Sequence, residues 1–347
     1  MPNRLQHLLE TRPWLLADGA TGTNYFAAGL ETGDAPELWN IDHPERVSAL
    51  HEAFIAAGSD ILLTNSFGGT RHRLKLHNAQ DRVAEINRAA AAIARRAADS
   101  SGREVVVAGS MGPTGEILAP IGELSEEDAA DAFAEQGAAL AEGGADVLWI
   151  ETMSSEEELR AAIKGAERAG LAYVCTLSFD TNGRTMMGVT PGRVARMMQE
   201  LSPAPLAYGG NCGTGASELM AALLNMSESA EPGDVLVAKS NCGIPEYVDG
   251  HIHYSDTPEL MADYARLCRD AGVRVIGGCC GTTAEHVAAM HAALQEHEPG
   301  ARPDTAAIVA RLGEISAGAE KQLAGEDSGA EAAAAARAER RRSRRRG

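Results

Sequence analysis

Three of the six cysteines in this chain of 347 residues stand where they could share one site. Cys212 ends one short apolar run, and the neighbours Cys279 and Cys280 end another. Zinc is commonly bound by cysteine thiolates, and three protein ligands leave a fourth position for a substrate. Glycines flank the cysteine pair, which allows the backbone to turn both thiols toward one ion. A Cys₃ zinc site of this kind suits alkyl transfer to a sulfur atom.

The cysteines also have a structural explanation. Judged by spacing alone, a core cysteine beside a loop cysteine explains the Cys279–Cys280 pair as well as zinc does, because the pair is not a Cys-x₂-Cys motif. Cys212 taken alone is better explained as a small core residue. We expect the remaining cysteines to lie in the core or in a loop: Cys175 in a strand, Cys268 in a helix and Cys242 in a loop.

Acids and histidines offer further chemistry. Asp18 and Glu151 each end an apolar run, and they could act as a general acid and base, hold an ammonium group, or satisfy nearby backbone groups. His251 and His253 form a His-x-His pair, as in some metal-dependent hydrolases. The pair lies in a polar segment, residues 249–256, without the later Lys and His of such a site. We therefore favour a structural or solvated loop for the histidines.

The secondary structure that must position these residues alternates along the chain. Short apolar, β-branched runs are separated by helix-like segments. The predicted strands are residues 15–18, 60–64, 104–110, 146–151, 172–178, 205–211, 234–240 and 273–279. Segments rich in Ala, Leu and Glu predict helices, among them residues 82–98, 126–142, 155–169, 257–271 and 283–294.

Strands that alternate with helices predict a parallel sheet, and eight such units fit a closed (β/α)₈ TIM barrel. A doubly wound open sheet is the alternative, but the turn at residues 18–23 is not the Gly-x-Gly-x-x-Gly loop expected there. Active sites of barrels lie at the carboxyl ends of the strands. That edge would bring together Asp18, Thr64, Glu151 and the three cysteines.

Charge and composition set limits on the class of protein. The formal net charge is −18, although residues 337–347 hold seven Arg and one Glu, so the body is acidic and nucleic acid is not an expected partner. No apolar run approaches the roughly 20 residues of a membrane helix. We expect a cytoplasmic protein, and the sequence is compatible with a homo-oligomer. The predicted domains are one barrel, residues 1–312, and a disordered basic tail rich in Ala, Glu and Arg, residues 313–347.

Several motifs then become recognisable together. The chain resembles the homocysteine S-methyltransferase family, which includes the homocysteine-binding module of cobalamin-dependent methionine synthase and the betaine–homocysteine methyltransferases. The resemblance runs from about residue 13 to 297. The matching stretches are residues 18–23, 58–67, 108–114, 142–152, 183–188, 209–213 (Gly-Gly-Asn-Cys-Gly) and 277–283 (Gly-Gly-Cys-Cys-Gly-Thr-Thr).

The resemblance implies a (β/α)₈ barrel that transfers a methyl group to homocysteine and forms methionine. It implies that one Zn²⁺ per chain is bound by Cys212, Cys279 and Cys280. It further implies that Asp18 and Glu151 hold the amino group of homocysteine, with Gly19 and Thr64 near its carboxylate. The zinc-activated thiol of the substrate would react directly, so no further catalytic residue is expected.

The methyl donor is less closely specified. Betaine enzymes of the family carry Tyr where this chain has Gly68 and Thr152, and a quaternary ammonium donor needs an aromatic cage. The sequence therefore favours methylcobalamin on a separate methylcorrinoid protein. The alternatives are betaine or another onium donor, a barrel metallohydrolase that uses the His251 pair, and a catalytically inactive zinc-binding barrel.

Overall fold

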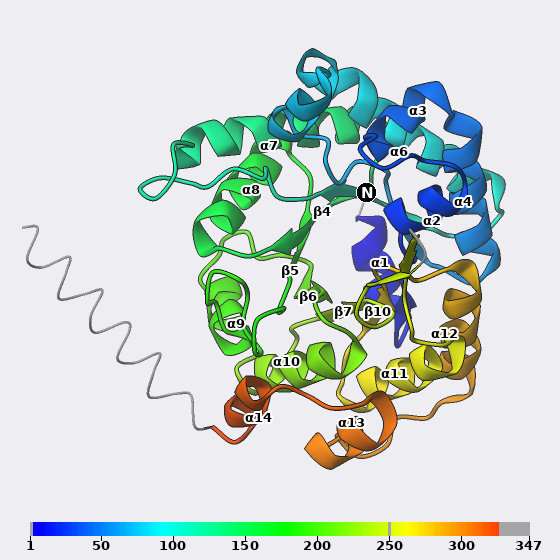
Figure 1. Ribbon diagram of the computed structural model, residues 1–347, viewed down its shortest axis with the longest axis vertical. Coiled ribbons are helices and arrows are strands. Elements are labelled where there is room, and N and C mark those ends of the chain that lie inside the picture. The colour runs from blue at the N-terminus through cyan, green and yellow to red at the C-terminus, as the bar shows by residue number, and fades with distance from the viewer. Residues whose placement is uncertain (1–2, 249–250, 326–347) are drawn as a thin grey trace, which may run out of the picture.

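The computed structural model describes residues 3–248 and 251–325, with the backbone alone for residues 246–248 and 251–253. Within those ranges eight parallel strands form one sheet in the order β1-β10-β7-β6-β5-β4-β3-β2 (Figure 1). The strands are β1 Leu15–Leu16, β2 Ile61–Leu63, β3 Val106–Met111, β4 Val147–Met153, β5 Tyr173–Leu177, β6 Ala207–Cys212, β7 Leu236–Ser240 and β10 Val275–Gly278.

Hydrogen bonds between β1 and β2 close the sheet into a barrel. Ala17 and Ile61 form a parallel bridge. The N–H of Asp60 donates to the carbonyl of Leu16 at 2.7 Å, and the N–H of Asp18 donates to the carbonyl of Ile61 at 3.0 Å. The predicted (β/α)₈ barrel is confirmed, and each of its strands overlaps a predicted run.

Helices surround the strands, as Figure 1 shows. The main ones are α4 Pro44–Ala56, α6 Val83–Ser100, α7 Glu126–Glu142, α8 Glu156–Ala169, α9 Pro191–Gln199, α10 Ala216–Glu228, α11 Pro258–Asp270 and α12 Ala284–Glu296. Local sequence explains several of their ends. The Ser155 hydroxyl caps α8 by accepting the N–H of Glu158, and Gly170 ends the helix in the left-handed conformation.

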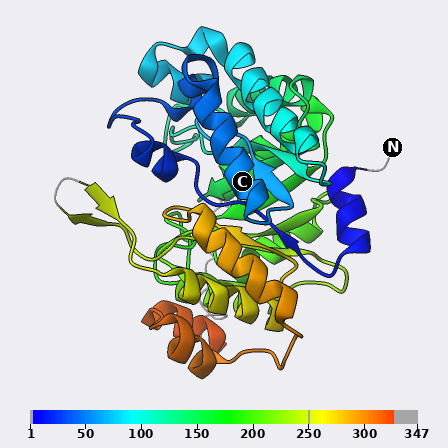
Figure 2. The same ribbon diagram turned by 90° about the vertical axis from the view of Figure 1, so that its right-hand side faces the viewer.

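The apolar core has two layers. One fills the inside of the barrel with strand side chains such as Val106, Trp149 and Val237, and the other lies between the strands and the surrounding helices. Helix α1, Arg4–Thr11, packs Leu5 and Leu8 into the first layer. Figure 2 shows α1 at the end of the molecule away from the β8–β9 hairpin. The amino-terminal end of the barrel is therefore closed, which leaves the carboxyl end for a site.

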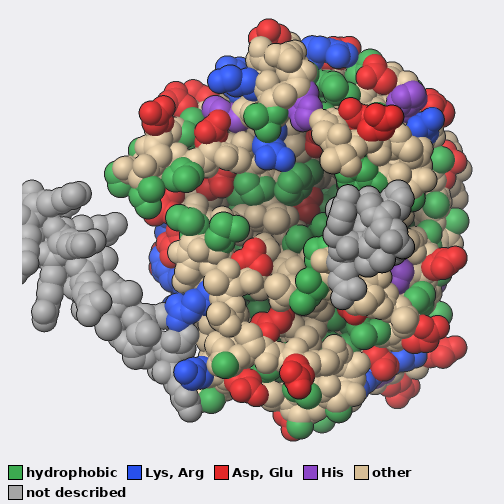
Figure 3. Space-filling model, viewed as in Figure 1, with side chains coloured by type: hydrophobic (Ala, Val, Ile, Leu, Met, Phe, Trp, Pro, Cys, Tyr) green, Lys and Arg blue, Asp and Glu red, His purple; other side chains and the backbone are tan. Residues whose placement is uncertain are grey.

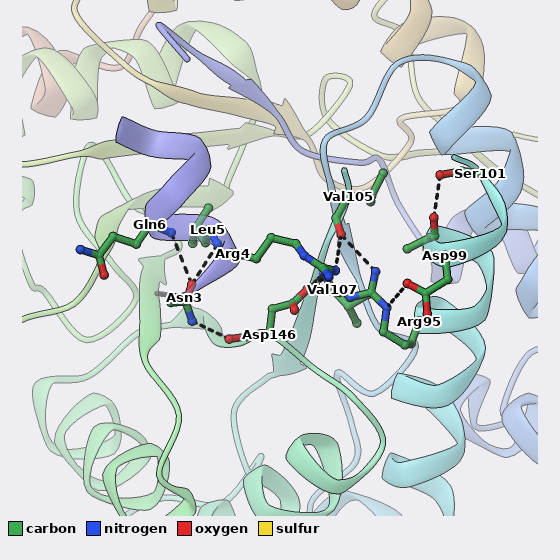
Figure 4. A network of polar contacts seen from close by, with 11 residues as sticks. Asn3, Arg4, Leu5, Gln6, Arg95, Asp99, Ser101, Val105, Val107 and Asp146 are labelled. Carbon is green, nitrogen blue, oxygen red and sulfur yellow. Dashed lines mark hydrogen bonds and ion pairs between the residues drawn. The ribbon is translucent and has the colours of Figure 1, made fainter. Parts of the chain in front are cut away.

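Polar contacts fasten α1 to the barrel (Figure 4). The side-chain amide of Asn3 donates to the carbonyl of Asp146 at 2.6 Å. The Arg4 guanidinium donates to the carbonyl of Val105 at 3.2 Å and pairs with the Asp146 carboxylate at 3.4 Å. Asp146 also pairs with Arg95 on α6 at 2.9 Å, so one carboxylate joins α1 and α6.

Shorter elements occupy the loops. They are α2 Gly22–Ala27, η1 Pro36–Leu38, α3 Trp39–Asp42, α5 Arg71–Leu74, η2 Lys75–His77, η3 Gln80–Arg82, the strands β8 Glu246–Val248 and β9 His251–His253, and α13 Thr305–Leu312 and α14 Ala317–Leu323. No helix in the described ranges is long and apolar enough to cross a membrane.

One sequence prediction needs correction here. His251 and His253 lie on β9, which pairs antiparallel with β8, so the backbone there is a hairpin strand and not a loop. The predicted domain boundary at residue 312 stays a prediction, and helix α14, which follows it, packs on α10. Ser316 caps α14 and its hydroxyl donates to Glu218 of α10 at 3.2 Å. The small residues of α14 gave no apolar signal, yet Ala319 is buried. Residues 326–347 of the predicted tail lie outside the described residues.

Candidate active site

The structure brings Cys212, Cys279 and Cys280 together at the carboxyl end of the barrel. Their sulfur atoms all lie within 4.8 Å of one another. Cys212 ends β6 with a φ of 60°, a left-handed conformation that a non-glycine residue rarely adopts and that is common at functional sites. Cys279 and Cys280 follow β10 directly. Three residues from two distant parts of the chain thus form one sulfur cluster.

The cluster fits a tetrahedral metal ion. Zinc–sulfur bonds of about 2.3 Å place sulfur atoms about 3.8 Å apart, so small side-chain movements would suffice. The hydrogen bond with Cys212 raises the pKa of the Cys279 thiol, and burial raises it further. Thiolates this close together repel one another, so the three cysteines lose their protons only when a cation such as zinc binds. The thiolate is the form that binds zinc. The other three cysteines are buried outside this cluster.

Backbone and amide contacts hold the cysteine turn in place. The Asn241 side chain accepts the N–H of Cys280 at 2.9 Å, and the N–H of Cys279 donates to the carbonyl of Ser240 at 2.6 Å. The Asn211 side-chain amide donates to the sulfur of Cys279 at 3.8 Å. These contacts hold the backbone of the cysteine pair and orient the sulfur of Cys279, as outer contacts of metal sites commonly do.

Glu151 lies on β4, near the cysteine cluster. Its carboxylate accepts the Ser110 hydroxyl at 2.5 Å and the Asn211 amide at 3.5 Å. Burial raises the pKa of Glu151, and the nearby Lys239 ammonium opposes that shift. The side chain still lines the cavity. Glu151 therefore keeps acceptor capacity for a cationic group of a ligand.

Asp18 is bound in a different way. Its side chain is fully buried, and one oxygen pairs with the Lys239 ammonium at 2.6 Å. The other oxygen accepts the N–H of Leu63 at 2.7 Å. The two predicted ammonium-binding acids thus lie in the same region, but Asp18 already has a cationic partner from β7.

Gly19 and Thr64, the residues predicted near a carboxylate, both line the cavity. A Cβ on Gly19 would lie 2.6 Å from the carbonyl oxygen of Thr282 and 2.8 Å from the Phe54 ring, so only glycine fits. The Thr64 hydroxyl accepts the N–H of Ser110 at 2.9 Å and lies 2.6 Å from the Ser66 hydroxyl. Thr64 therefore also ties β2 to β3.

A cavity of about 390 Å³ joins these residues. Glu151, Lys239 and the three cysteines line it together with Gly19 and Thr64. Figure 3 looks onto this hollowed face, which carries the carboxyl ends of the strands. Further lining comes from the loops and includes Phe26, Phe67, Glu37, Arg73 and His77.

Sequence reasoning missed one contributor to this site, and it placed a second, Asn211, at the end of a strand without giving it a role. Lys239 lies in the otherwise apolar run of β7, and it is buried. A lysine in a buried strand requires a partner of opposite charge. The single lysine within this apolar run therefore indicated a buried ion pair. Asn211 lies next to Cys212, and its side chain contacts Glu151, Thr152 and Cys279. Its role depends on distances across the barrel, which the sequence does not show.

The fold and the site together define a (β/α)₈ barrel with a sulfur cluster and a carboxylate facing one cavity. Residues 15–294 match the family model described as homocysteine S-methyltransferase. The chain belongs to this family.

Relatives and solved structures agree with that assignment. The chain is 30% identical over 297 residues to methionine synthase of Mycobacterium tuberculosis, a match that covers 81% of this chain and 24% of that protein. Methionine synthase of Mycobacterium leprae is 29% identical, with 85% of this chain and 26% of that protein covered. The chain thus spans about a quarter of the length of these curated relatives.

The solved structure of the homocysteine methyltransferase MmuM from Escherichia coli, in its metallated form, has a TM-score of 0.65 and 26% identity. The match covers 84% of this chain and 99% of that one. The oxidised form of the same enzyme has a TM-score of 0.65 and 27% identity.

Proposed function

We propose that this chain is a zinc-dependent S-methyltransferase that converts homocysteine to methionine. The observation that carries the proposal is that the sulfur cluster of Cys212, Cys279 and Cys280 opens into the same cavity as Glu151. The cavity thus combines a metal position that can bind a thiol with a carboxylate that can bind an ammonium group. This combination suits an amino acid with a thiol side chain. Membership of the family and the metallated relative support the same substrate and a metal.

The residues of the chain explain how the reaction would be arranged. Bound zinc would lower the pKa of a coordinated substrate thiol, so that the thiolate is present at neutral pH. Glu151, oriented by Ser110 and Asn211, would hold the α-ammonium group and thereby fix the direction of the sulfur. Methyl transfer to a thiolate needs no proton transfer, so the carboxylates would orient the substrate without acting as bases.

For the methyl donor we propose methylcobalamin presented by a separate methylcorrinoid protein. Gly68 and Thr152 supply no ring where the betaine enzymes of the family have Tyr, and Phe26 and Phe67 are the aromatic residues of the lining. Two rings without a third leave a quaternary ammonium poorly enclosed. This chain spans about a quarter of the two methionine synthases, so about three quarters of each lies outside the match. That proportion is compatible with a methyl donor bound by a part other than this barrel.

A small onium donor is the second candidate, because one observation favours it. Glu37 is a buried carboxylate in the lining of the cavity, where its oxygen accepts the N–H of Gly68 at 2.6 Å. Burial raises the pKa of Glu37, and the Arg73 guanidinium and His77 oppose that shift. A cationic methyl group beside Phe67 would further stabilise the charged form of this carboxylate.

The experiment that tests the proposal measures methionine formed from homocysteine by the zinc-loaded chain under reducing conditions. Methylcobalamin, betaine, dimethylsulfoniopropionate and S-methylmethionine are supplied in parallel, with Cys280→Ser as the control. Methionine formed with methylcobalamin alone supports the methylcorrinoid donor. Turnover with an onium compound alone would replace it with the second candidate, and no methionine from any of these donors would contradict the proposed activity.

A further inference from the structure

The Gly-Arg-Thr-Met-Met-Gly motif at residues 183–188 has no part in the cavity described above. The motif lies in the loop between β5 and α9, and although the structure describes all of it, none of its residues lines the cavity. Thr185 in its middle is nevertheless fully buried, whereas Met186 and Met187 after it are exposed. A buried polar side chain in a loop needs hydrogen-bond partners, and those of Thr185 show what the motif holds.

The Thr185 hydroxyl fastens this loop to the end of β4. It donates to the carbonyl of Ser154 at 2.6 Å and accepts the N–H of Val189 at 3.1 Å. The main chain of Thr185 also closes the turn, because its carbonyl accepts the N–H of Gly188 at 2.8 Å. Ser154 directly follows β4 and stands three positions after Glu151. One side chain thus links the motif to the strand that carries Glu151.

The end of β4 depends on such contacts because its pairing with β5 is irregular. Regular register is lost between Ile150 and Met153, so Glu151 lies in the irregular part. An irregular stretch of strand lacks some of the ladder hydrogen bonds that fix a regular one. The pairing resumes at Met153, and the Ser154 carbonyl next to it accepts the Thr185 hydroxyl. Thr185 is therefore one of the groups that fix the carboxyl-terminal side of the irregular part.

Helix α14 packs against the tip of the same loop. Asn182 and Gly183 form this tip, with left-handed φ values of 51° and 74°, as expected of a two-residue Asn-Gly turn. A Cβ on Gly318 of α14 would overlap the carbonyl oxygen of Asn182, and a Cβ on Gly183 would lie 3.0 Å from the Cα of Ala319. The backbones of the helix and of the turn are therefore in direct contact, which glycine permits.

Contacts with α10 hold α14 in this place. The Ser217 hydroxyl of α10 donates to the carbonyl of Glu314 at 2.8 Å, and the Asn225 amide of α10 donates to the carbonyl of Gln322 at 3.3 Å. Figure 1 shows α14 beside α10 at the edge of the barrel. The helix lies beyond residue 294, where the match to the family model ends. This support of the motif therefore comes from outside the matched region.

We infer that Thr185 is a positioning residue that holds Glu151 at the cavity through the carbonyl of Ser154, and that α14 keeps the motif in the conformation that this contact needs. The inference rests on the proposed function where it concerns the substrate, because Glu151 is the group that would receive the ammonium of homocysteine. Neither Thr185 nor any described residue of α14 lines the cavity, so both act through the position of β4.

The first measurement follows hydrogen exchange of the main chain by mass spectrometry, which needs no substrate. Thr185→Val replaces the hydroxyl by a methyl group of nearly the same size, and we expect residues 150–155 to exchange at least about 5-fold faster. Thr185→Ser keeps the hydroxyl and should exchange like the wild type. Thr181→Val is the matched control, because the Thr181 hydroxyl is exposed and donates to Asp180 of its own loop.

Binding distinguishes a positioning role from general support of the fold. Homocysteine and 4-mercaptobutanoate, which lacks the amine, are titrated into the zinc-loaded full chain by isothermal titration calorimetry. A displaced Glu151 affects only the thiol that carries the amine. Thr185→Val should therefore bind homocysteine about 10-fold more weakly and 4-mercaptobutanoate as tightly as the wild type does. Zinc content should stay at the wild-type value, and Thr185→Ser should restore homocysteine binding.

The helix is tested by Gly318→Ala, which places a methyl group against the carbonyl of Asn182. We expect faster exchange of residues 150–155 and weaker homocysteine binding, as for Thr185→Val. Lys321→Ala, at an exposed position of α14, should match the wild type. Circular dichroism shows whether each variant is folded. Wild-type exchange and binding in Gly318→Ala would overturn the role of α14.

Unchanged exchange in Thr185→Val, or an equal loss of affinity for both thiols, would show that Thr185 does not position Glu151 and would overturn the inference. A wild-type chain that binds neither thiol would contradict the proposed function alone. Hydrogen exchange would still decide in that case whether Thr185 and α14 hold the end of β4.

Discussion

Asn211 on β6 holds Thr152 on β4 in a left-handed conformation through two hydrogen bonds. The Asn211 side-chain oxygen accepts the N–H of Thr152 at 2.8 Å, and its amide donates to the Thr152 hydroxyl at 2.7 Å. Thr152 has a φ of 62°, and it directly follows Glu151. The register between β4 and β5 is also irregular between Ile150 and Met153. Asn211 thereby stabilises the irregular part of β4 from which the Glu151 side chain lines the cavity.

We predict that Asn211→Ala destabilises the protein by about 2–4 kcal/mol, because it removes the hydrogen bonds that Asn211 makes to Thr152 and Glu151 of β4. Urea denaturation followed by circular dichroism measures the change. Thr152→Gly is the control, since glycine adopts the left-handed conformation without cost while one hydrogen bond is lost. If Asn211→Ala is no more destabilising than Thr152→Gly, then Asn211 does not hold this part of β4.

The sulfur cluster predicts which cysteines bind metal. Replacing Cys212, Cys279 or Cys280 by Ser should remove zinc and reduce methionine formation by at least about 100-fold, because a three-coordinate site loses one of its ligands. Cys242→Ser is the matched control. Cys242 is buried close to the cysteine turn, with its sulfur 3.2 Å from the Thr282 hydroxyl, yet it is not part of the cluster.

Metal content by mass spectrometry and activity are read together for this series. The expected result is one zinc per chain in the wild type and in Cys242→Ser. Full zinc content in Cys280→Ser, or its loss in Cys242→Ser, would contradict the proposed ligands. Removal of zinc from the wild type by a chelator should abolish activity, and added zinc should restore it.

Two glycines, Gly19 after β1 and Gly22 at the first residue of α2, test how closely the backbone approaches the cavity. Gly19→Ala should destabilise the protein by about 2–4 kcal/mol and impair homocysteine binding, because the new methyl group would overlap the carbonyl of Thr282 and the Phe54 ring. Gly22→Ala should be neutral or slightly stabilising, since an added Cβ there has no atom within 4 Å. Denaturation midpoints of both variants give the comparison, and equal midpoints would be inconsistent with the packing described here.

His51 on α4 predicts a pH dependence of stability. Its side chain is fully buried, and neither ring nitrogen has a hydrogen-bond partner among the described residues. Burial lowers the pKa of His51 from 6.5 to about 4, so the unfolded chain binds a proton that the folded chain does not. Stability from this group is fully present above about pH 6.5 and is lost as the pH falls toward 4, by about 3 kcal/mol in all.

The measurement compares the unfolding free energy of the wild type and of His51→Leu between pH 7 and pH 4. The His51→Leu variant should lack the loss of stability that comes from His51, so its unfolding free energy should fall less steeply between pH 7 and pH 4. His7→Leu, at an exposed position of α1, should follow the wild-type profile. A profile of His51→Leu that parallels the wild type would show that His51 is not the group that titrates.

Local sequence patterns predicted the architecture, because each barrel strand and several of the helices have a signal of their own. The run at residues 146–151 is β-branched and apolar, and the helix after it has Ser155 as its cap and acids in its first turn. Such signals depend on neighbours in the chain, so they predicted eight units and a closed barrel. α14 was missed for the same reason, since its burial depends on contacts with α10 and not on its own composition.

The sequence by itself determined which residues reach the site: the motifs placed Asp18, Glu151 and the cysteines at the carboxyl ends of strands. Only the tertiary structure decided which of them face the cavity. Lys239 and Asp18 are 221 positions apart, and their 2.6 Å contact exists because β7 and β1 flank β10 in the closed barrel. Coulomb interactions in a buried site depend on distances of a few ångströms, and spacing along a chain does not fix those distances.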